Sequence, residues 1–246
     1  MKLRSIYLFC YSLTVAVSMV AQTRTAPTVI HAMSDVSHAY TFHADWGFQR
    51  QYLRDQKYAK SWCALYHSDL SNANLLFLNG CEDPLSYVPR DIKKINSFLK
   101  EGGGVMILGN QRGKSQNELA KHFGAEFKSG VKEPLIPRCF TTDSVKVKAN
   151  PVYLTLQNPK EWTIVVSDAA NQPLLAYKKV NKGTVVVGAR ALMGDHPDKA
   201  SDSINSTLWR PLWELAASGK KVNPLKPLKD CYIETLEHRK KEGLLT

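Results

Sequence analysis

Polar and reactive side chains follow three short apolar runs of this 246-residue chain, each at the point where the run ends. They are Cys81 and Glu82 after the first run, Asn110, Gln111 and Arg112 after the second, and Arg190 and His196 after the third. A cysteine thiolate is a nucleophile, an imidazole is a general base, and a guanidinium holds a carboxylate or sulfate through paired hydrogen bonds. If the three runs are strands of one sheet, these side chains line a common crevice at its edge.

Other residues with chemical potential point less clearly to a site. His31, His38 and His43 form a loose group, but no H-E-x-x-H motif accompanies them, so we predict neither a zinc-peptidase centre nor any other metal or cofactor. The tryptophans are spaced as helix and strand core residues, which favours packing over stacking on sugar rings; they are Trp46, Trp62, Trp162, Trp209 and Trp213.

The elements that position the candidate residues are clearest between 74 and 124. The apolar run 74–79 ends in Gly80, which is typical of a strand buried on both faces. Pro89 opens a helix with an apolar face, and the glycines of 100–104 end it before a second buried strand at 105–108. Ser115 is a predicted N-cap, with Glu118 completing a capping box, for a helix over 116–123. Strand, helix, strand, helix predicts a parallel sheet.

Flanking segments extend this pattern on both sides. Upstream we expect a strand at 28–30, a helix at 46–56 and a strand at 62–66. Downstream the pattern predicts strands at 161–167, 173–180 and 183–191, with a tight hairpin at 181–183, and a final amphipathic helix at 203–218. The fold class is therefore α/β, a three-layer sandwich with a mostly parallel central sheet.

The order of these motifs resembles the class I glutamine-amidotransferase-like superfamily, a flavodoxin-like α/β fold. The resemblance covers about 70–217 and rests on the phrases FLKEGGGVMILGN and VNKGTVVVGAR before a closing helix. It is nearest to non-catalytic domains of secreted bacterial enzymes: N-terminal domains of mucin-degrading zinc peptidases, trehalose-utilisation-type domains and trimerisation domains of some β-galactosidases. Enzymes of the superfamily carry a cysteine in a G-x-C-x-G turn between a strand and a helix, and a distant His-x-Glu pair.

This chain keeps the frame of that turn but not its nucleophile. Gln111 stands at the centre of Gly109-Asn110-Gln111-Arg112-Gly113, and an amide does not attack a carbonyl at neutral pH. His196-Pro197-Asp198 is similar to the His-x-Glu pair, with a shorter carboxylate. Two interpretations stay open: the glycines serve only the turn and His196 is an exposed loop residue, or the old crevice still binds a ligand. Cys81 is an alternative nucleophile, but no glycine-framed turn surrounds it.

The N-terminal residues predict export, and the C-terminal residues predict a linker and a short helix outside the main domain. Lys2 and Arg4 precede an apolar run at 6–17, the pattern of a signal peptide, and we expect cleavage after Ala21 or Ser18. An uncleaved N-terminal anchor is the alternative. We expect one amidotransferase-like domain over 27–218 and, over 219–246, a Lys- and Pro-rich linker followed by a short charged helix. No later stretch has the length of a membrane span.

The net charge restricts the classes of partner that we expect, and the cysteine content restricts the disulfides. The formal net charge is +11, which suits acidic partners, but the lysines are scattered without interleaved aromatic residues, so nucleic-acid binding is not predicted. Outside the leader the cysteines are Cys63, Cys81, Cys139 and Cys231, which permit two disulfides in three pairings.

From these observations we expect an exported, secreted or periplasmic, non-catalytic module that binds a partner protein or an anionic glycan. The alternatives are a hydrolase or lyase that uses Cys81 or His196, and an accessory domain of a larger secreted enzyme. The sequence predicts no oligomeric state.

Overall fold

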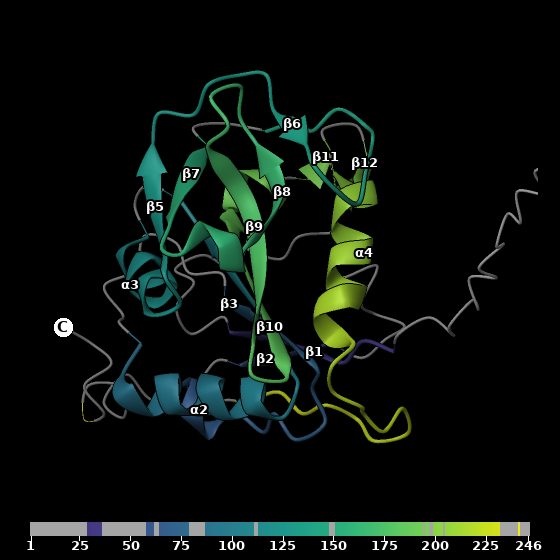
Figure 1. Ribbon diagram of the computed structural model, residues 1–246. Helices are drawn as coiled ribbons and strands as arrows, with labels where there is room; N and C mark the ends of the chain where they lie inside the picture. The colour runs from purple at the N-terminus through teal and green to yellow at the C-terminus, as the bar shows by residue number, and fades with distance from the viewer. Residues whose placement is uncertain are drawn as a thin grey trace, which may run out of the picture.

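The computed structural model describes residues 29–35, 58–61, 64–78, 87–110, 113–147, 151–193, 195–196, 199–203, 205–231 and 241. Their centre is an eight-stranded sheet in the order β2-β1-β3-β4-β10-β9-β8-β6 (Figure 1). In chain order its strands are β1 Ala32–Asp35, β2 Tyr58–Ser61, β3 Leu75–Leu78, β4 Gly104–Gly109, β6 Ile136–Pro137, β8 Thr163–Ser167, β9 Pro173–Val180 and β10 Gly183–Ala189.

The sheet is mixed, so the expectation of a mostly parallel sheet is not confirmed. Strands β2, β1, β3, β4 and β10 pair in parallel, whereas β9, β8 and β6 continue the sheet antiparallel to their neighbours. The cause is the predicted hairpin itself. Asn181 adopts a left-handed φ of 56°, which reverses the chain between β9 and β10. A loop this short joins only antiparallel strands.

Helices cover both faces of the sheet, which gives the expected three layers. They are α2 Pro89–Lys100, α3 Lys114–His122 and α4 Ser206–Ala217. A Cβ on Gly104 would meet the carbonyl oxygen of Ala216 in α4 at 2.5 Å, and one on Gly183 would meet Leu99 of α2 at 2.9 Å. Gly104 pairs with Thr184, so it and Gly183 face opposite sides of the sheet. The helices α2 and α4 therefore lie on opposite faces.

A two-stranded ribbon extends the layer that contains α2 and α3. It pairs β5 Ala125–Ser129 with β7 Val152–Leu156 in antiparallel register, and Phe127 of β5 packs against Gly109 of β4. Figure 1 shows this ribbon and α3 on one side of β9 and β10, with α4 on the other side.

The apolar faces that drive the helices onto the sheet are those the sequence pattern predicts. In α2 the buried apolar residues Ile95, Phe98 and Leu99 share one face. In α4 the aromatic pair Trp209 and Trp213 lies one turn apart, and both are fully buried. Trp213 meets Phe77 of β3 edge to face, with ring centroids 5.5 Å apart.

Several predicted element boundaries are wrong, and four of these errors have a clear local cause. The first strand is β1 at 32–35, not 28–30, because its polar residues Ser34 and Asp35 are buried with the rest of the strand. The strand expected at 62–66 is β2 at 58–61, and Leu65–His67 forms a 3₁₀ turn, η2.

The other two errors concern the starts and ends of elements. Helix α3 begins at Lys114 behind Gly113, and Ser115 is no N-cap because its buried hydroxyl donates to Gln116 Oε1 over 2.9 Å. Strand β10 ends at Ala189, where the 3₁₀ turn η4 Arg190–Met193 begins. The helix expected at 46–56 lies outside the described residues.

The stretch after α4, expected to be a linker, lies against the amino ends of the strands. The side chain of Asn72 donates to the carbonyl oxygens of Asn223 and Lys226, over 3.1 Å and 2.7 Å, and accepts from the Asn223 N–H over 2.8 Å. Lys220 Nζ donates to the carbonyl oxygen of Leu70 over 2.9 Å. The domain boundary at 218 stays a prediction.

A substitution at Gly104 tests how α4 sits on the sheet. Gly104→Ala places a methyl group against the backbone of Ala216, and we expect a loss of about 2–3 kcal/mol in the free energy of unfolding in urea, the cost of overpacking. Gly130→Ala is the control: Gly130 has φ of +106° and nothing within 4 Å of a Cβ, so only backbone strain of about 1 kcal/mol is expected. Equal losses for the two variants would contradict the packing of α4 on Gly104.

Candidate functional site

Two of the predicted site residues come together where neighbouring strands end. Strands β4 and β10 pair in parallel, and their last residues, Gly109 and Ala189, face each other in the register. Adjacent strands lie about 4.8 Å apart. Asn110 and Arg190, which follow these two residues, therefore begin their loops side by side at the carboxyl edge of the sheet, and both are half-buried.

The turn between β4 and α3 has the strand-to-helix form that the sequence predicts. Strand β4 ends at Gly109 and α3 begins at Lys114. Asn110 spans the turn, because its Oδ1 accepts a hydrogen bond from the Gly113 N–H over 2.9 Å. Gln111 and Arg112, between these anchors, lie outside the described residues. In the sequence the central residue between Gly109 and Gly113 is Gln111, whose side chain is an amide.

The remaining predicted residues are only partly described. Cys81 and Glu82 lie outside the described residues, after β3, which is the strand next to β4. His196 belongs to β11 Asp195–His196, which pairs antiparallel with β12 Lys199–Ser203. Figure 1 shows this ribbon near the end of the sheet opposite the β9–β10 hairpin, and therefore at the end where Arg190 lies.

The strand order reveals a second part of the same edge. In the sheet β1 lies between β2 and β3. The chain adds β2 on one side of β1 and then adds β3 and β4 on the other side, so the direction in which strands are added reverses between β1 and β3. Ligands of open α/β sheets bind in the crevice outside the carboxyl ends of strands at such a switch point. Asp35, the last residue of β1, is fully buried there.

Asp91 fixes the start of α2 at this edge. Its Oδ1 accepts from the Tyr66 N–H over 3.0 Å, and its Oδ2 accepts from the Val88 N–H over 3.1 Å. A carboxylate in the first turn also interacts favourably with the helix dipole. The fully buried side chain therefore joins the 3₁₀ turn η2 to the first turn of α2, which is a structural task.

Tyr87 lies beside these acids, and its hydroxyl stays protonated over a wide pH range. Burial raises the pKa of Tyr87 well above its ordinary value, and the negative charges of Asp35 and Asp91 raise it further, while a hydrogen bond with Gln116 lowers it. A tyrosine hydroxyl in this setting is a donor or a neutral acceptor for a ligand, not a base.

Sequence reasoning missed Asp35, Tyr87, Asp91 and Gln116. One signal was available for Asp35, an acidic residue directly behind an apolar stretch, but the predicted first strand ends before it. Tyr87 and Asp91 flank the predicted helix start at Pro89. Nothing local indicates that they approach Asp35, because strand order alone brings these segments together.

The other candidate groups that the structure describes lie away from this edge or have structural roles. His31 lies at the amino end of β1, is buried, and has Nδ1 2.9 Å from the carbonyl oxygen of Asn72. His38 and His43 lie outside the described residues. Within the ranges given above, no group of three or more His, Cys, Asp or Glu side chains is placed to hold a metal ion. In the same ranges no helix has the length and apolarity to cross a membrane.

The cysteines do not form the two disulfides that their number permits. Cys139 is a free thiol whose Sγ lies 3.7 Å from the carbonyl oxygen of Ile164, and burial raises its pKa. Cys231 is disulfide-bonded. Cys63 and Cys81 lie outside the described residues.

Comparison with known proteins addresses the fold alone. No family model and no curated protein sequence matches the chain. Among solved structures, the mmIFT52 N-terminal domain is similar with a TM-score of 0.58 and 13% sequence identity, over 76% of this chain and 97% of that chain. The two proteins share a fold, and this likeness says nothing about activity.

Two further structures bear names from the superfamily that the sequence resembles. A putative ThuA-like protein from Parabacteroides merdae has a TM-score of 0.45 and 12% identity, over 82% of this chain and 95% of that chain. A putative GMP synthase protein from Thermoplasma acidophilum has a TM-score of 0.41 and 15% identity, over 77% of this chain and 95% of that chain. Both TM-scores are below 0.5, so neither likeness assigns this chain to a superfamily or to a function.

Alkaline unfolding tests the surroundings of Tyr87. An unfolded tyrosine ionises at about pH 10. Folded Tyr87 keeps its proton to a higher pH, so its contribution to stability is complete below about pH 10 and is lost as the pH rises from there towards the folded-state pKa. Above about pH 10 we expect the free energy of unfolding to fall less steeply with pH in Tyr87→Phe than in the parent protein. Urea titration at a series of pH values measures this free energy. Tyr153→Phe, in β7, is the control and is expected to follow the parent curve; identical curves for all three proteins would contradict the assignment.

Proposed function

We propose that this chain is an exported, non-catalytic module of amidotransferase-like fold that binds an anionic glycan or a partner protein at the carboxyl edge of its sheet. The observation that supports it most is the β4–α3 turn. The frame in which the superfamily's enzymes hold a cysteine is present, closed by the Asn110–Gly113 hydrogen bond, and its central residue is Gln111. A turn without a nucleophile favours binding over acyl transfer.

The character of the ligand follows from charge. Arg190 stands next to Asn110 at the edge, and a guanidinium binds carboxylate or sulfate with two hydrogen bonds. The chain as a whole carries a formal charge of +11, which attracts anions over a longer range. Asn110 adds an amide, the neutral polar group that commonly hydrogen-bonds to sugar hydroxyls. An acidic sugar satisfies all three features.

Export rests on the charged and apolar pattern of residues 1–21, and the disulfide at Cys231 is in keeping with an oxidising compartment. The branch we infer is the one of accessory domains in secreted enzymes, such as the trehalose-utilisation type. This chain would then act beside a catalytic partner or as one part of a larger enzyme.

A hydrolase or lyase remains the competing function, with Cys81 as nucleophile or His196 as base. Its support is their position after the strands that flank the crevice. The buried polar residues of this edge give the enzymatic function little support. Asp91 accepts hydrogen bonds from two backbone N–H groups, and Tyr87, with its raised pKa, is a poor base.

Binding at the carboxyl edge is tested on a glycan array, followed by titration calorimetry with the glycans that bind and by affinity capture for a protein partner. Arg190→Gln is expected to weaken binding at least about tenfold, since a charge-assisted hydrogen bond contributes about 1.5–3 kcal/mol. Arg190→Lys should keep part of the affinity, and Arg210→Gln, on the exposed surface of α4, should keep all of it. If no array glycan and no protein binds, the proposal is wrong.

Thiol labelling distinguishes the competing enzymatic function from the proposed binding function. We expect Cys81 to react with iodoacetamide no faster than a model thiol at pH 7, because the sequence around it has no glycine-framed motif of the kind that activates a nucleophile. Mass spectrometry of tryptic peptides identifies the modified residue, and Cys139, half-buried with a raised pKa, is the slow internal reference. Labelling of Cys81 that is much faster than that of a model thiol would favour the hydrolase.

A further inference from the structure

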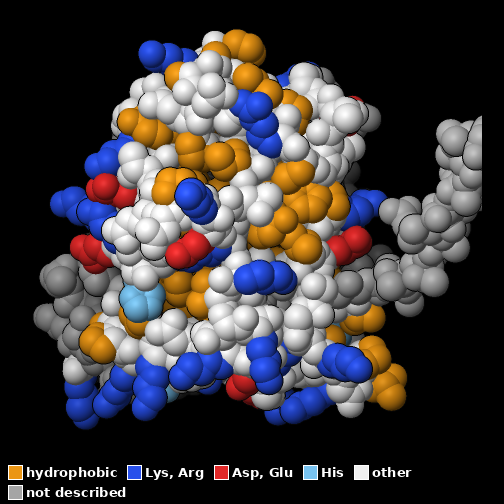
Figure 2. Space-filling model, viewed as in Figure 1, with side chains coloured by type: hydrophobic (Ala, Val, Ile, Leu, Met, Phe, Trp, Pro, Cys, Tyr) orange, Lys and Arg blue, Asp and Glu red, His pale blue; other side chains and the backbone are white. Residues whose placement is uncertain are grey.

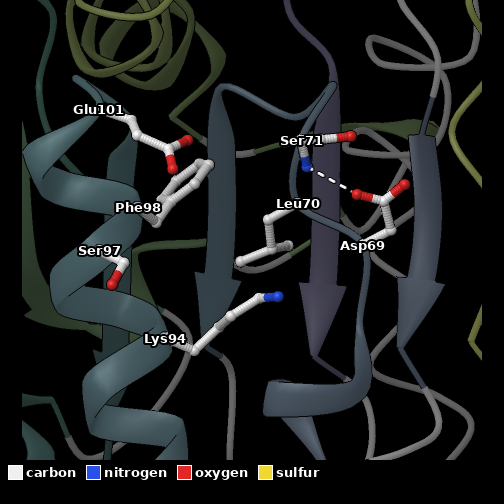
Figure 3. A pocket seen from close by; sticks show the side chains of 7 residues that line it. All are labelled: Asp69, Leu70, Ser71, Lys94, Ser97, Phe98 and Glu101. Atoms are coloured by element: carbon white, nitrogen blue, oxygen red, sulfur yellow. Dashed lines mark hydrogen bonds between the residues drawn. The ribbon is translucent and has the colours of Figure 1, made fainter.

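A hollow of about 440 Å³ lies at the opposite, amino edge of the sheet, between α2 and the residues that precede β3. It is lined by Asp69, Leu70 and Ser71 on one side and by Lys94, Ser97, Phe98 and Glu101 on the other (Figure 3). Its volume falls within the range of ligand pockets, about 300–1,000 Å³. None of the residues predicted from the sequence to form a site belongs to it.

Both acidic side chains of the hollow are already engaged by donors of the chain itself. Asp69 Oδ1 accepts from the Ser71 N–H over 2.9 Å (Figure 3). Hydrogen bonds from the Ser71 hydroxyl and N–H lower the pKa of Asp69, and the nearby charges of Lys226 and Lys94 lower it further. Glu101 Oε2 forms an ion pair with Lys220 Nζ at 2.7 Å. Asp69 therefore stays ionised to a lower pH than an ordinary aspartate, and both acids already have partners within the chain.

Lys94 is the cation of the lining, and its charge acts on the nearby carboxylate of Asp69. Its ammonium makes no hydrogen bond and no ion pair with any residue that the structure describes. The side chain is half-buried, and Figure 3 shows it reaching from α2 across the hollow towards Leu70. Ser97, one turn further along the helix, also lines the hollow.

The surroundings of the hollow are basic. Figure 2 shows Lys and Arg side chains gathered along the border of the molecule formed by α2 and the segment after α4. The exposed members from these segments and the β9–β10 hairpin are Arg90, Lys93, Lys100, Lys182, Lys221, Lys226 and Lys229. Such a surface raises the local concentration of anions and directs them to the hollow.

We propose that this hollow binds the anionic group, carboxylate or sulfate, of an acidic sugar, with Lys94 as its cation and the Ser97 hydroxyl as a second donor. The site goes beyond the proposed function, because it lies at the other edge of the sheet and stands even if Arg190 and its neighbours bind nothing. A module with anion sites at both edges would hold an acidic polysaccharide at two separate points.

The lack of exposed aromatic rings in the described residues disfavours single-stranded nucleic acid as the ligand. In the part of the chain for which exposure is described, no Phe, Tyr or Trp side chain is exposed. Phe98, in the wall of the hollow, is almost completely buried, and Lys220 Nζ lies 4.8 Å from the centre of its ring. Single-stranded nucleic acids gain much of their binding energy from stacking on exposed rings. A carboxylate or sulfate needs only the ammonium and the hydroxyl.

Isothermal titration calorimetry of the full chain with three tetrasaccharides tests the proposal. Tetragalacturonate carries carboxylates, a κ-carrageenan tetrasaccharide carries sulfates, and cellotetraose is uncharged. We expect one or both acidic sugars to bind at physiological salt and cellotetraose to bind much more weakly. Lys94→Gln should weaken binding of the acidic sugar at least about tenfold. Lys93→Gln removes the same charge from the adjacent, exposed position and should change the affinity less than about twofold.

A second variant keeps the charge and removes the space. Ser97→Tyr fills the hollow and should weaken binding as much as Lys94→Gln, while thermal unfolding confirms that both variants are folded. Equal effects of Lys93→Gln and Lys94→Gln, no binding of either acidic sugar, or tighter binding of a single-stranded oligonucleotide would each overturn the assignment. Loss of binding in Arg190→Gln with Lys94→Gln unaffected would also reject this site, while it would support the proposed carboxyl-edge site.

Discussion

The arrangement of this fold depends on contact between backbones at the amino end of β4, where three segments distant in sequence converge. A Cβ on Gly102, after α2, would overlap the carbonyl group of Gly219, after α4. A Cβ on Gly104 would overlap the backbone of Ala216 in α4. A Cβ on Gly183, at the start of β10, would overlap the carbonyl oxygen of Gly103. These contacts hold the end of α2, the β9–β10 hairpin and the end of α4 against one another. Protein interiors are packed densely enough that even one methyl group at such a joint forces an element to move.

The consequences of this joint reach both edges of the sheet. At the amino edge it brings the segment after α4 beside α2, so that Lys220 engages Glu101 and leaves Lys94 as the cation of the hollow. At the carboxyl edge it sets the register of β10 against β4, and that register places Arg190 next to Asn110. The two candidate sites are therefore products of one packing constraint, although their residues have nothing in common.

The sequence predicts the parts of this structure that are encoded locally. Strand β3, helix α2 and strand β4 are correct because continuous apolar runs, a proline at the helix start and glycines at its end each act over a few residues. The prediction misplaces strand β1 because a buried Ser34 and Asp35 look like a loop when strand pairing is unknown. Asn72 gives no signal at all, since its partners Asn223 and Lys226 are far along the chain. The same limit hides the hollow around Lys94, whose walls come from two segments and whose Glu101 pairs with Lys220 of a third.

The glycines of the β4–α3 turn show that a motif can have a packing reason as well as a chemical one. In an enzyme the glycines permit a strained turn that presents a nucleophile. Here Gly109 has a second reason to persist, because a Cβ at this position would enter the ring of Phe127 in β5. Gly113 has an ordinary φ of −74° and caps α3 without any special conformation. Packing against Phe127 therefore explains Gly109 whatever the role of residue 111. What then distinguishes a binding edge from a catalytic one is the set of side chains beside the turn, and at this edge they include a guanidinium and an amide.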